Sequence, residues 1–289
     1  MWWKVVLVAV SALALIAALA LSWWGPSFLG GGQFEGSYKP DTRIIKALAG
    51  VSSYDGKIVY AEIDRNLVAD VLPPSLRLAD PKGPVVTKHP IILIYGKQKQ
   101  PETTLLGPPP LPIADYDELI LIIPFVQSTN GSHWHNYVVR MYLDSPAAVF
   151  GGNVFFGYRK ELAELDDTSG FDVSQSGILR FEAADNPTSA WMSAAEADMQ
   201  FTHFKDLREI MEMPILGTKD FMYVCSYFVW NFDNADLRRI HTSFRFVSKF
   251  TAGMNPWTNL GPLSEFAANA FEVRNLHWWL YFPLPYCQF

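Results

Sequence analysis

The chain has 289 residues and a formal net charge of −6, with 49 % apolar, 15 % aromatic and 18 % charged residues. An acidic chain without a basic stripe cannot neutralise a phosphate backbone, which argues against nucleic-acid binding. The apolar content is enough for a sizeable core. The two cysteines, Cys225 and Cys287, lack metal-ligand spacing. We expect them to be buried thiols, with one disulfide as the alternative.

The N-terminal segment is a candidate membrane helix. Residues 5–24 form an almost purely apolar run, long enough to span a bilayer core, with tryptophans at both ends. Lys4, the only nearby positive charge, favours a single-pass anchor with the domain on the non-cytoplasmic side. The alternative is a cleaved signal peptide with Ala18-Leu19-Ala20 as its cleavage site, which predicts a secreted domain. We therefore predict an anchor or signal peptide over residues 1–25, a linker over 26–45 and one domain over 46–289.

Strands dominate the predicted elements of this domain. In chain order we expect strands at residues 57–64, 90–95, 118–126, 137–143, 178–182, 222–232, 237–250 and 276–282. Residues 65–71 predict a short helix, residues 100–112 a proline-rich loop and residues 194–211 a longer helix. The polar stretch with Asn130-Gly131 predicts a β-hairpin between the third and fourth strands. Many strands with few helices predict an α+β fold of mostly antiparallel β-structure.

The stretch from residue 116 to residue 162 is the most informative. It contains Tyr-Asp-Glu at 116–118, Tyr-Leu-Asp-Ser-Pro-Ala-Ala at 142–148 and Gly-Tyr-Arg-Lys-Glu-Leu at 157–162. Here the chain resembles the acetoacetate decarboxylase family. That family has a Tyr-x-Glu strand start, a Tyr-(Leu/Val)-Asp strand end, an Ala-rich turn into a Gly-containing helix, and an aromatic-Pro-Lys-Lys-Leu segment. The resemblance implies a cone-like β-barrel with a few flanking helices. The apolar N-terminal run adds a transmembrane helix to this predicted fold.

The resemblance also implies catalytic roles for two residues. Lys160 matches the Schiff-base lysine of the family, and Glu118 matches the glutamate at the pocket, where a carboxylate can orient substrate or move protons. A lysine must lose its proton before it can attack a ketone, and its ordinary pKa is about 10.4. Burial in apolar surroundings and a neighbouring cation both lower that pKa.

Two neighbours of Lys160 depart from the family pattern. Glu161 stands where the family has its second lysine, and a carboxylate beside Lys160 would raise the pKa of the amine. Arg159 replaces a proline and could supply a cation from the other side. We name Tyr158, Arg159 and Glu161 as candidate substrate-binding residues.

The predicted function is that of a lyase-type enzyme acting on a keto acid or related carbonyl compound through an imine on Lys160. Decarboxylation and related aldol or dehydration chemistry remain open, and secondary metabolism is a hypothesis. The alternatives are a non-catalytic module that binds a small apolar ligand in the barrel, and an enzyme that uses Glu118 alone. We expect no cofactor and no metal site, since His133 and His135 lack further ligands. A small carbonyl substrate and the membrane are the predicted partners, and a homo-oligomer is compatible with the sequence.

Overall fold

The computed structural model describes residues 48–79, 87–104, 111–131, 133–165, 181–183, 190–196, 210–219, 222–232, 235–246 and 265–284. The predicted N-terminal anchor and the linker lie outside these ranges. Within them, no helix has both the length and the apolar character that a bilayer-spanning segment needs.

Thirteen strands and two helices make up this described part of the chain. In chain order they are β1 (Leu48–Asp64), α2 (Arg65–Ala69), β2 (Leu76–Leu78), β3 (Lys88–Thr103), β4 (Leu111–Pro112), β5 (Tyr116–Ser128), β6 (His135–Leu143), α3 (Pro146–Phe156), β7 (Lys160–Leu165), β8 (Phe181–Ala183), β9 (Ala190–Glu196), β10 (Ile215–Lys219), β11 (Met222–Asn231), β12 (Asp236–Phe246) and β13 (Glu265–Leu284).

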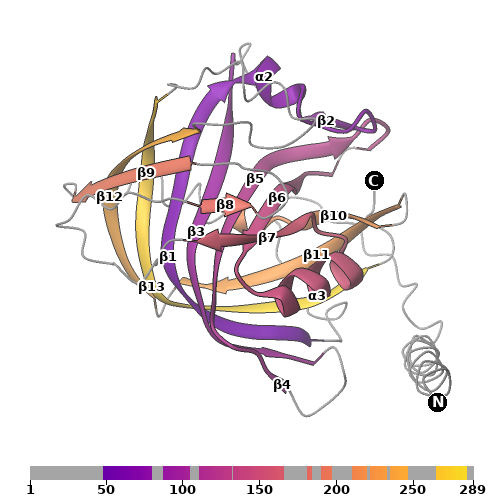
Figure 1. Ribbon diagram of the computed structural model, residues 1–289. Coiled ribbons are helices and arrows are strands. Elements are labelled where there is room, and N and C mark those ends of the chain that lie inside the picture. The colour runs from indigo at the N-terminus through magenta and orange to yellow at the C-terminus, as the bar shows by residue number, and fades with distance from the viewer. Residues whose placement is uncertain are drawn as a thin grey trace. The chain divides into compact units, whose positions relative to one another are not determined.

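Seven of the described strands close into a barrel, in the order β5-β3-β1-β13-β11-β10-β6, and β6 pairs with β5 to complete the ring. The ring is mixed, because β10 and β6 run parallel while its other pairs are antiparallel. Figure 1 shows the long, curved strands β1 and β13 side by side in this wall. The shorter strand β7 adds to β6 in parallel and carries Lys160 at its start. The predicted barrel is therefore confirmed, with parallel pairing around β6.

Most predicted strands are confirmed but are longer in the structure. The hairpin of β5 and β6 is confirmed as an antiparallel pair. The predicted loop at residues 100–112 is partly wrong, since β3 continues to Thr103 and β4 pairs with it. The predicted helix at residues 194–211 is wrong at its start, where β9 pairs with β12. Cross-strand pairing outweighs the modest helix propensity of that segment. Residues 197–209 lie outside the described ranges.

Cys225 also departs from the prediction. It lies on β11 and is in a disulfide, so the expectation of a free buried thiol is wrong at this position. The other cysteine of the chain, Cys287, lies outside the described residues. Cys225 pairs with Leu284 of the neighbouring strand β13, a strand pairing that sequence spacing does not reveal.

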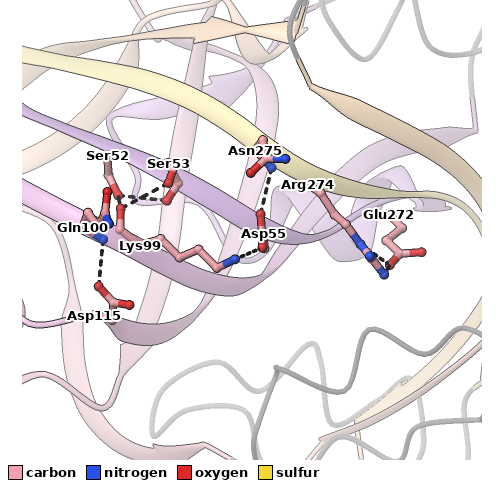
Figure 2. Close-up of polar contacts among 9 residues, drawn as sticks. All are labelled: Ser52, Ser53, Asp55, Lys99, Gln100, Asp115, Glu272, Arg274 and Asn275. Atoms are coloured by element: carbon pink, nitrogen blue, oxygen red, sulfur yellow. Dashed lines mark hydrogen bonds and ion pairs between the residues drawn. The ribbon is translucent and has the colours of Figure 1, made fainter.

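Three of the β-bulges in the described barrel strands contain a residue in the left-handed region. Gln100, Phe125 and Asn275 have φ angles of 49°, 55° and 55°, in the left-handed region that non-glycine residues rarely adopt. Each lies where the strand register shifts, as expected for an extra residue inserted into one strand. Carboxylates hold two of the bulges: Asp115 accepts from the Gln100 N–H at 2.7 Å and Asp55 from the Asn275 N–H at 2.8 Å (Figure 2).

The bulge at Asn275 changes which side chains of β13 face one another across the core. Phe271 and Val273 before it, and Leu276 and Trp278 after it, belong to the same apolar cluster. Because side chains alternate along a strand with a period of two, only an inserted residue lets odd and even positions share one face. Lys99 makes an ion pair with Asp55 and supports this arrangement (Figure 2).

Two apolar clusters lie on the two faces of the barrel strands. The first core cluster includes Val59, Ile91, Leu93, Leu121, Ile123 and Val139, and Val68 of α2 packs with it. The second core cluster includes Ile58, Ile92, Ile94, Ile120, Ile122 and Trp278, and Ala148 and Phe156 of α3 pack with it. The alternation of neighbouring positions between the clusters is the pattern of strands that are buried on both faces.

His89 of β3 is buried against a backbone carbonyl and a cation. Its Nε2–H donates to the carbonyl of Pro124 at 2.8 Å, and its Nδ1 lies 3.4 Å from an Arg65 guanidinium nitrogen. Burial, opposed in part by the hydrogen bond to Pro124, lowers the pKa of His89 to about 4. The neutral imidazole is therefore the form that the folded protein holds at neutral pH.

Acidification should therefore destabilise the fold through His89. Since its folded-state pKa lies below the ordinary value, the unfolded chain binds more protons as the pH falls from about 6.5 towards about 4. Between about pH 7.5 and about pH 5, the free energy of unfolding should fall by roughly 2 kcal/mol more in the wild type than in His89→Gln, measured by urea titration. His277→Gln, at an exposed position of β13, should behave as the wild type. Equal losses in wild type and His89→Gln would contradict the prediction.

Candidate active site

A cavity of about 100 Å³ opens among the side chains of the second core cluster. Its wall is supplied by helix α3 and by strands β1, β3, β5, β6, β7, β10, β11 and β13. Its polar lining residues include Gln98, Tyr116, Glu118, Tyr158 and Lys160, and most of the others are aliphatic or aromatic. Such a mainly apolar cavity with a few convergent polar groups is typical of a small-molecule site.

Helix α3 and the turn after it bring Lys160 to this cavity. Ser145 caps the helix by accepting from the Ala148 N–H at 3.3 Å, and Pro146 follows at the first helical position. Gly157, with a φ of 64°, ends the helix in the left-handed conformation that glycine adopts easily. The Asn153 side chain then clamps the backbone of Lys160, accepting from its N–H at 2.8 Å and donating to its carbonyl at 2.9 Å.

The Lys160 side chain lies directly on the helix at Gly152. A methyl group on Gly152 would overlap Cδ and Cε of Lys160, so only glycine leaves room for this chain path. The Nζ atom lies 6.0 Å from the centroid of the buried Tyr158 ring. The helix and the ring therefore confine the amine between them.

Lys160 and Glu118 influence each other through opposing effects. Burial lowers the pKa of Lys160, and the charge of Glu118 raises it. Burial raises the pKa of Glu118, whereas Lys160 and a hydrogen bond from Gln98 lower it, and Asp117 adds to the rise. Glu118 is 3 % exposed, so little water screens the pair. Burial favours the neutral amine and the neutral carboxyl, whereas the attraction between the two groups favours the charged pair. Such opposing effects are a useful condition for proton transfer.

A chain of hydrogen bonds holds Glu118 from the side of β3. Gln98 Nε2 donates to Glu118 Oε1 at 2.5 Å, and Trp278 Nε1 donates to Gln98 Oε1 at 2.8 Å. Two buried phenols, Tyr54 and Tyr116, have pKa values raised by burial and by the charge of Glu118, so both stay protonated. Sequence reasoning missed Gln98 and the hydrogen bond that Trp278 makes to it, because these residues lie outside the stretch from 116 to 162 and meet only in the folded barrel.

The other predicted site residues separate into two groups. Tyr158 lies on the cavity wall with Lys160 and Glu118. Arg159 is exposed and Glu161 makes an ion pair with Arg140, and neither lines the cavity. Successive strand residues point to opposite faces, so Glu161 leaves the site that Lys160 enters. The expectation that Glu161 raises the pKa of Lys160 is therefore corrected, because Glu118 is the carboxylate with that effect.

Among the residues with a described placement, no group of three or more His, Cys, Asp and Glu side chains is arranged to hold a metal ion. His135 begins β6 and is buried, and burial lowers its pKa to about 4. His133 precedes it in the connection from β5.

The comparisons with known proteins agree with this architecture. The family model for acetoacetate decarboxylase matches residues 47–264. An acetoacetate decarboxylase-like enzyme from Sphingomonas wittichii RW1 shares the fold with a TM-score of 0.56 at 12 % identity, over 89 % of this chain and 100 % of that one. Acetoacetate decarboxylase from Legionella pneumophila gives 0.52 at 14 % identity, over 90 % and 93 %. The enduracididine biosynthesis enzyme MppR gives 0.53 at 12 % identity, over 88 % and 97 %. No curated protein matches the chain in sequence.

The contact between Gly152 and Lys160 predicts a change of sign in a double-mutant cycle. In the wild type, Gly152→Ala should lower the free energy of unfolding by about 1–3 kcal/mol, because the methyl group overlaps the lysine side chain. In the Lys160→Ala background the same change should raise it by up to about 1 kcal/mol, since alanine is the better helix former. Thermal or urea unfolding of the four proteins measures both steps. A loss of equal size in both backgrounds would show that the overlap is not with Lys160.

Proposed function

Because the chain belongs to the acetoacetate decarboxylase family, we propose that it is a lyase-type enzyme acting on a small keto acid or a related carbonyl compound. In this proposal Lys160 forms a Schiff base with the substrate, and Glu118 orients the substrate or moves protons. The observation that carries the proposal is the partly buried Lys160, which lines a mainly apolar cavity together with Glu118. Burial favours the neutral amine, which is the form that attacks a carbonyl.

The proposed chemistry begins with attack of the Lys160 nitrogen on the carbonyl carbon. A C–N bond forms, and proton transfers allow the carbonyl oxygen to leave as water, which gives a protonated imine. In a β-keto acid the bond to the carboxylate carbon then breaks, and its electron pair moves towards the imine nitrogen as CO₂ leaves. Protonation of the resulting enamine and hydrolysis release the ketone and restore Lys160. The same imine can serve aldol or dehydration chemistry, so the reaction type stays open between these.

Glu118 suits the proton transfers of this sequence. Burial raises the pKa of its carboxyl towards the range in which a group can both accept and donate a proton at neutral pH. Gln98 engages one carboxyl oxygen, Oε1, and the second oxygen remains for the substrate.

The cavity, with a volume of about 100 Å³, supports a small substrate. One structural relative, MppR, is known as a complex with pyruvate, a small keto acid. The lining rings Phe228, Trp230 and Trp278 would face the apolar part of such a substrate.

Borohydride trapping tests the proposed imine. With a panel of small keto acids and ketones, wild-type protein should gain a substrate-dependent mass adduct on the peptide that contains Lys160. Lys160→Ala should lose that adduct. Lys88→Ala is the matched control, because Lys88 also begins a strand but is exposed, and it should keep the adduct.

Borohydride trapping also distinguishes the proposed enzyme from the alternative, a non-catalytic binding module. The charge of Glu118 raises the pKa of Lys160, and this effect favours an unreactive ammonium and a non-catalytic module that binds a small apolar ligand. The absence of any adduct in the wild type across the panel, with ligand binding retained in calorimetry, would replace the enzyme by that module.

We also propose that residues 1–25 tether the domain to a membrane, with the domain on the non-cytoplasmic side. The disulfide at Cys225 supports an oxidising compartment. Alkaline carbonate extraction of membranes from expressing cells should leave the full-length chain in the pellet. Removal of residues 1–25 should move it to the soluble fraction. Release of the full-length chain by carbonate would contradict the anchor, and a mature chain that begins after residue 20 would identify a signal peptide.

A further inference from the structure

We infer that Trp278 is a positioning residue that acts through the side-chain amide of Gln98 to hold Glu118 as a hydrogen-bond acceptor facing Lys160. Its importance for catalysis rests on the proposed function, whereas the contacts themselves do not. The inference starts from a chain of two hydrogen bonds, Trp278 to Gln98 at 2.8 Å and Gln98 to Glu118 at 2.5 Å.

The indole N–H of Trp278 sets the direction of these two hydrogen bonds. An indole N–H can only donate, whereas an amide accepts at its oxygen and donates at its nitrogen. With the Gln98 oxygen turned to Trp278, the NH₂ group must face Glu118. The reversed amide would bring two donors together at Trp278 and two acceptors together at Glu118. Trp278 therefore excludes the reversed orientation, and Gln98 can only donate to the carboxylate.

Burial strengthens the preference of the Gln98 amide for this orientation. Gln98, Glu118 and Trp278 are 3 %, 3 % and 6 % exposed, so water does not replace a lost partner. The indole is itself held by neighbouring rings. Its centroid lies 5.1 Å from that of Phe228 and 6.5 Å from that of Trp230, distances typical of packed aromatic pairs.

The bulge at Asn275 places Trp278 on the same side of the barrel wall as Gln98. The extra residue at Asn275 brings Trp278 to the face that carries Phe271 and Val273. Without it, the alternation of β13 would turn the indole to the opposite face. Asp55 holds this bulge, and Asp115 holds the bulge at Gln100, two residues after Gln98 (Figure 2).

Several charged and titratable groups around Glu118 act on its pKa together with the hydrogen bond from Gln98. Glu118 interacts with Lys160 from β7, with Asp117 and Tyr116 from its own strand, and with Tyr54 from β1. The charge of Glu118 raises the pKa values of both tyrosines, and Asp117 raises the pKa of Glu118. Apart from Lys160, Gln98 is the one described neighbour that lowers the pKa of Glu118.

Loss of this donor should reach Lys160 through Glu118. When the carboxylate loses the amide donor, its pKa rises and it carries less negative charge near neutral pH. Lys160 then loses the anion that raises the pKa of its amine. Tyr158, whose ring centroid lies 6.0 Å from the amine, and Glu102 also line the cavity and are unchanged by the substitution. The pKa of Lys160 should therefore fall.

The test measures Lys160 without any substrate. Full-length, detergent-solubilised protein is labelled with trace acetic anhydride over a range of pH, and the rate at Lys160 is compared with that at exposed Lys88 by peptide mass spectrometry. Trp278→Phe keeps a ring and removes the N–H, and Gln98→Met keeps the volume and removes the amide. Both should lower the pKa of Lys160 by about half to one unit, which is roughly three- to tenfold faster labelling near pH 7. Trp134→Phe, an exposed tryptophan away from the cavity, should label as the wild type.

The double variant Trp278→Phe/Glu118→Gln separates this role from simple packing. Glu118→Gln alone should lower the pKa of Lys160, and adding Trp278→Phe should change it no further, because the effect passes through Glu118. A further shift of the same size in that background would overturn the inference, as would wild-type labelling of Trp278→Phe. If Trp278→Phe does not fold, Gln98→Met with and without Glu118→Gln gives the same decision. Failure of borohydride trapping in the wild type would end the proposed function but leave these labelling results unaffected.

Discussion

The pairing of β5 with β6 is the contact on which the rest of the structure depends. It joins the two ends of a curved sheet, so that each of the seven ring strands has hydrogen-bonded neighbours on both sides. A closed wall of this kind has no exposed ladder edge and can shield an interior from water. Only such shielding allows a lysine and a glutamate to act strongly on each other, because bulk water would screen their charges. The candidate site is thus a consequence of closure.

The β-bulges determine which side chains of the barrel wall face the cavity. A strand with unbroken alternation offers one face to the cavity along its whole length. The inserted residues at Gln100, Phe125 and Asn275 interrupt that alternation. Two carboxylates, the buried Asp55 and the exposed Asp115, stabilise two of these interruptions from the side. The barrel therefore presents Trp278 to Gln98 through the backbone irregularity at Asn275, which carries no catalytic group itself.

The electrostatics of the site rest on a balance between burial and one charge. Burial favours the neutral amine of Lys160, and Glu118 favours its ammonium. The family pattern has a second lysine beside the first, but this chain has Glu161, whose side chain pairs with Arg140 outside the cavity. Reactivity at Lys160 therefore depends on how strongly Glu118 remains charged, which the Gln98 amide influences directly. This balance differs from activation by a neighbouring cation.

The sequence by itself determined the family, the predominance of strands, and the pairing of Lys160 with Glu118, because continuous apolar runs and a local motif are readable without knowledge of distant contacts. It also led to four errors: the helix at 194–211 begins as a strand, the loop at 100–112 is partly strand, Cys225 is not a free thiol, and Glu161 does not face Lys160. The contact of Gln98 with Trp278 could not be predicted, since the two residues are 180 positions apart in the chain and meet only when β3 and β13 lie in one closed wall. Only the tertiary structure decided which face each strand residue occupies, because a single bulge reverses the alternation of every residue beyond it.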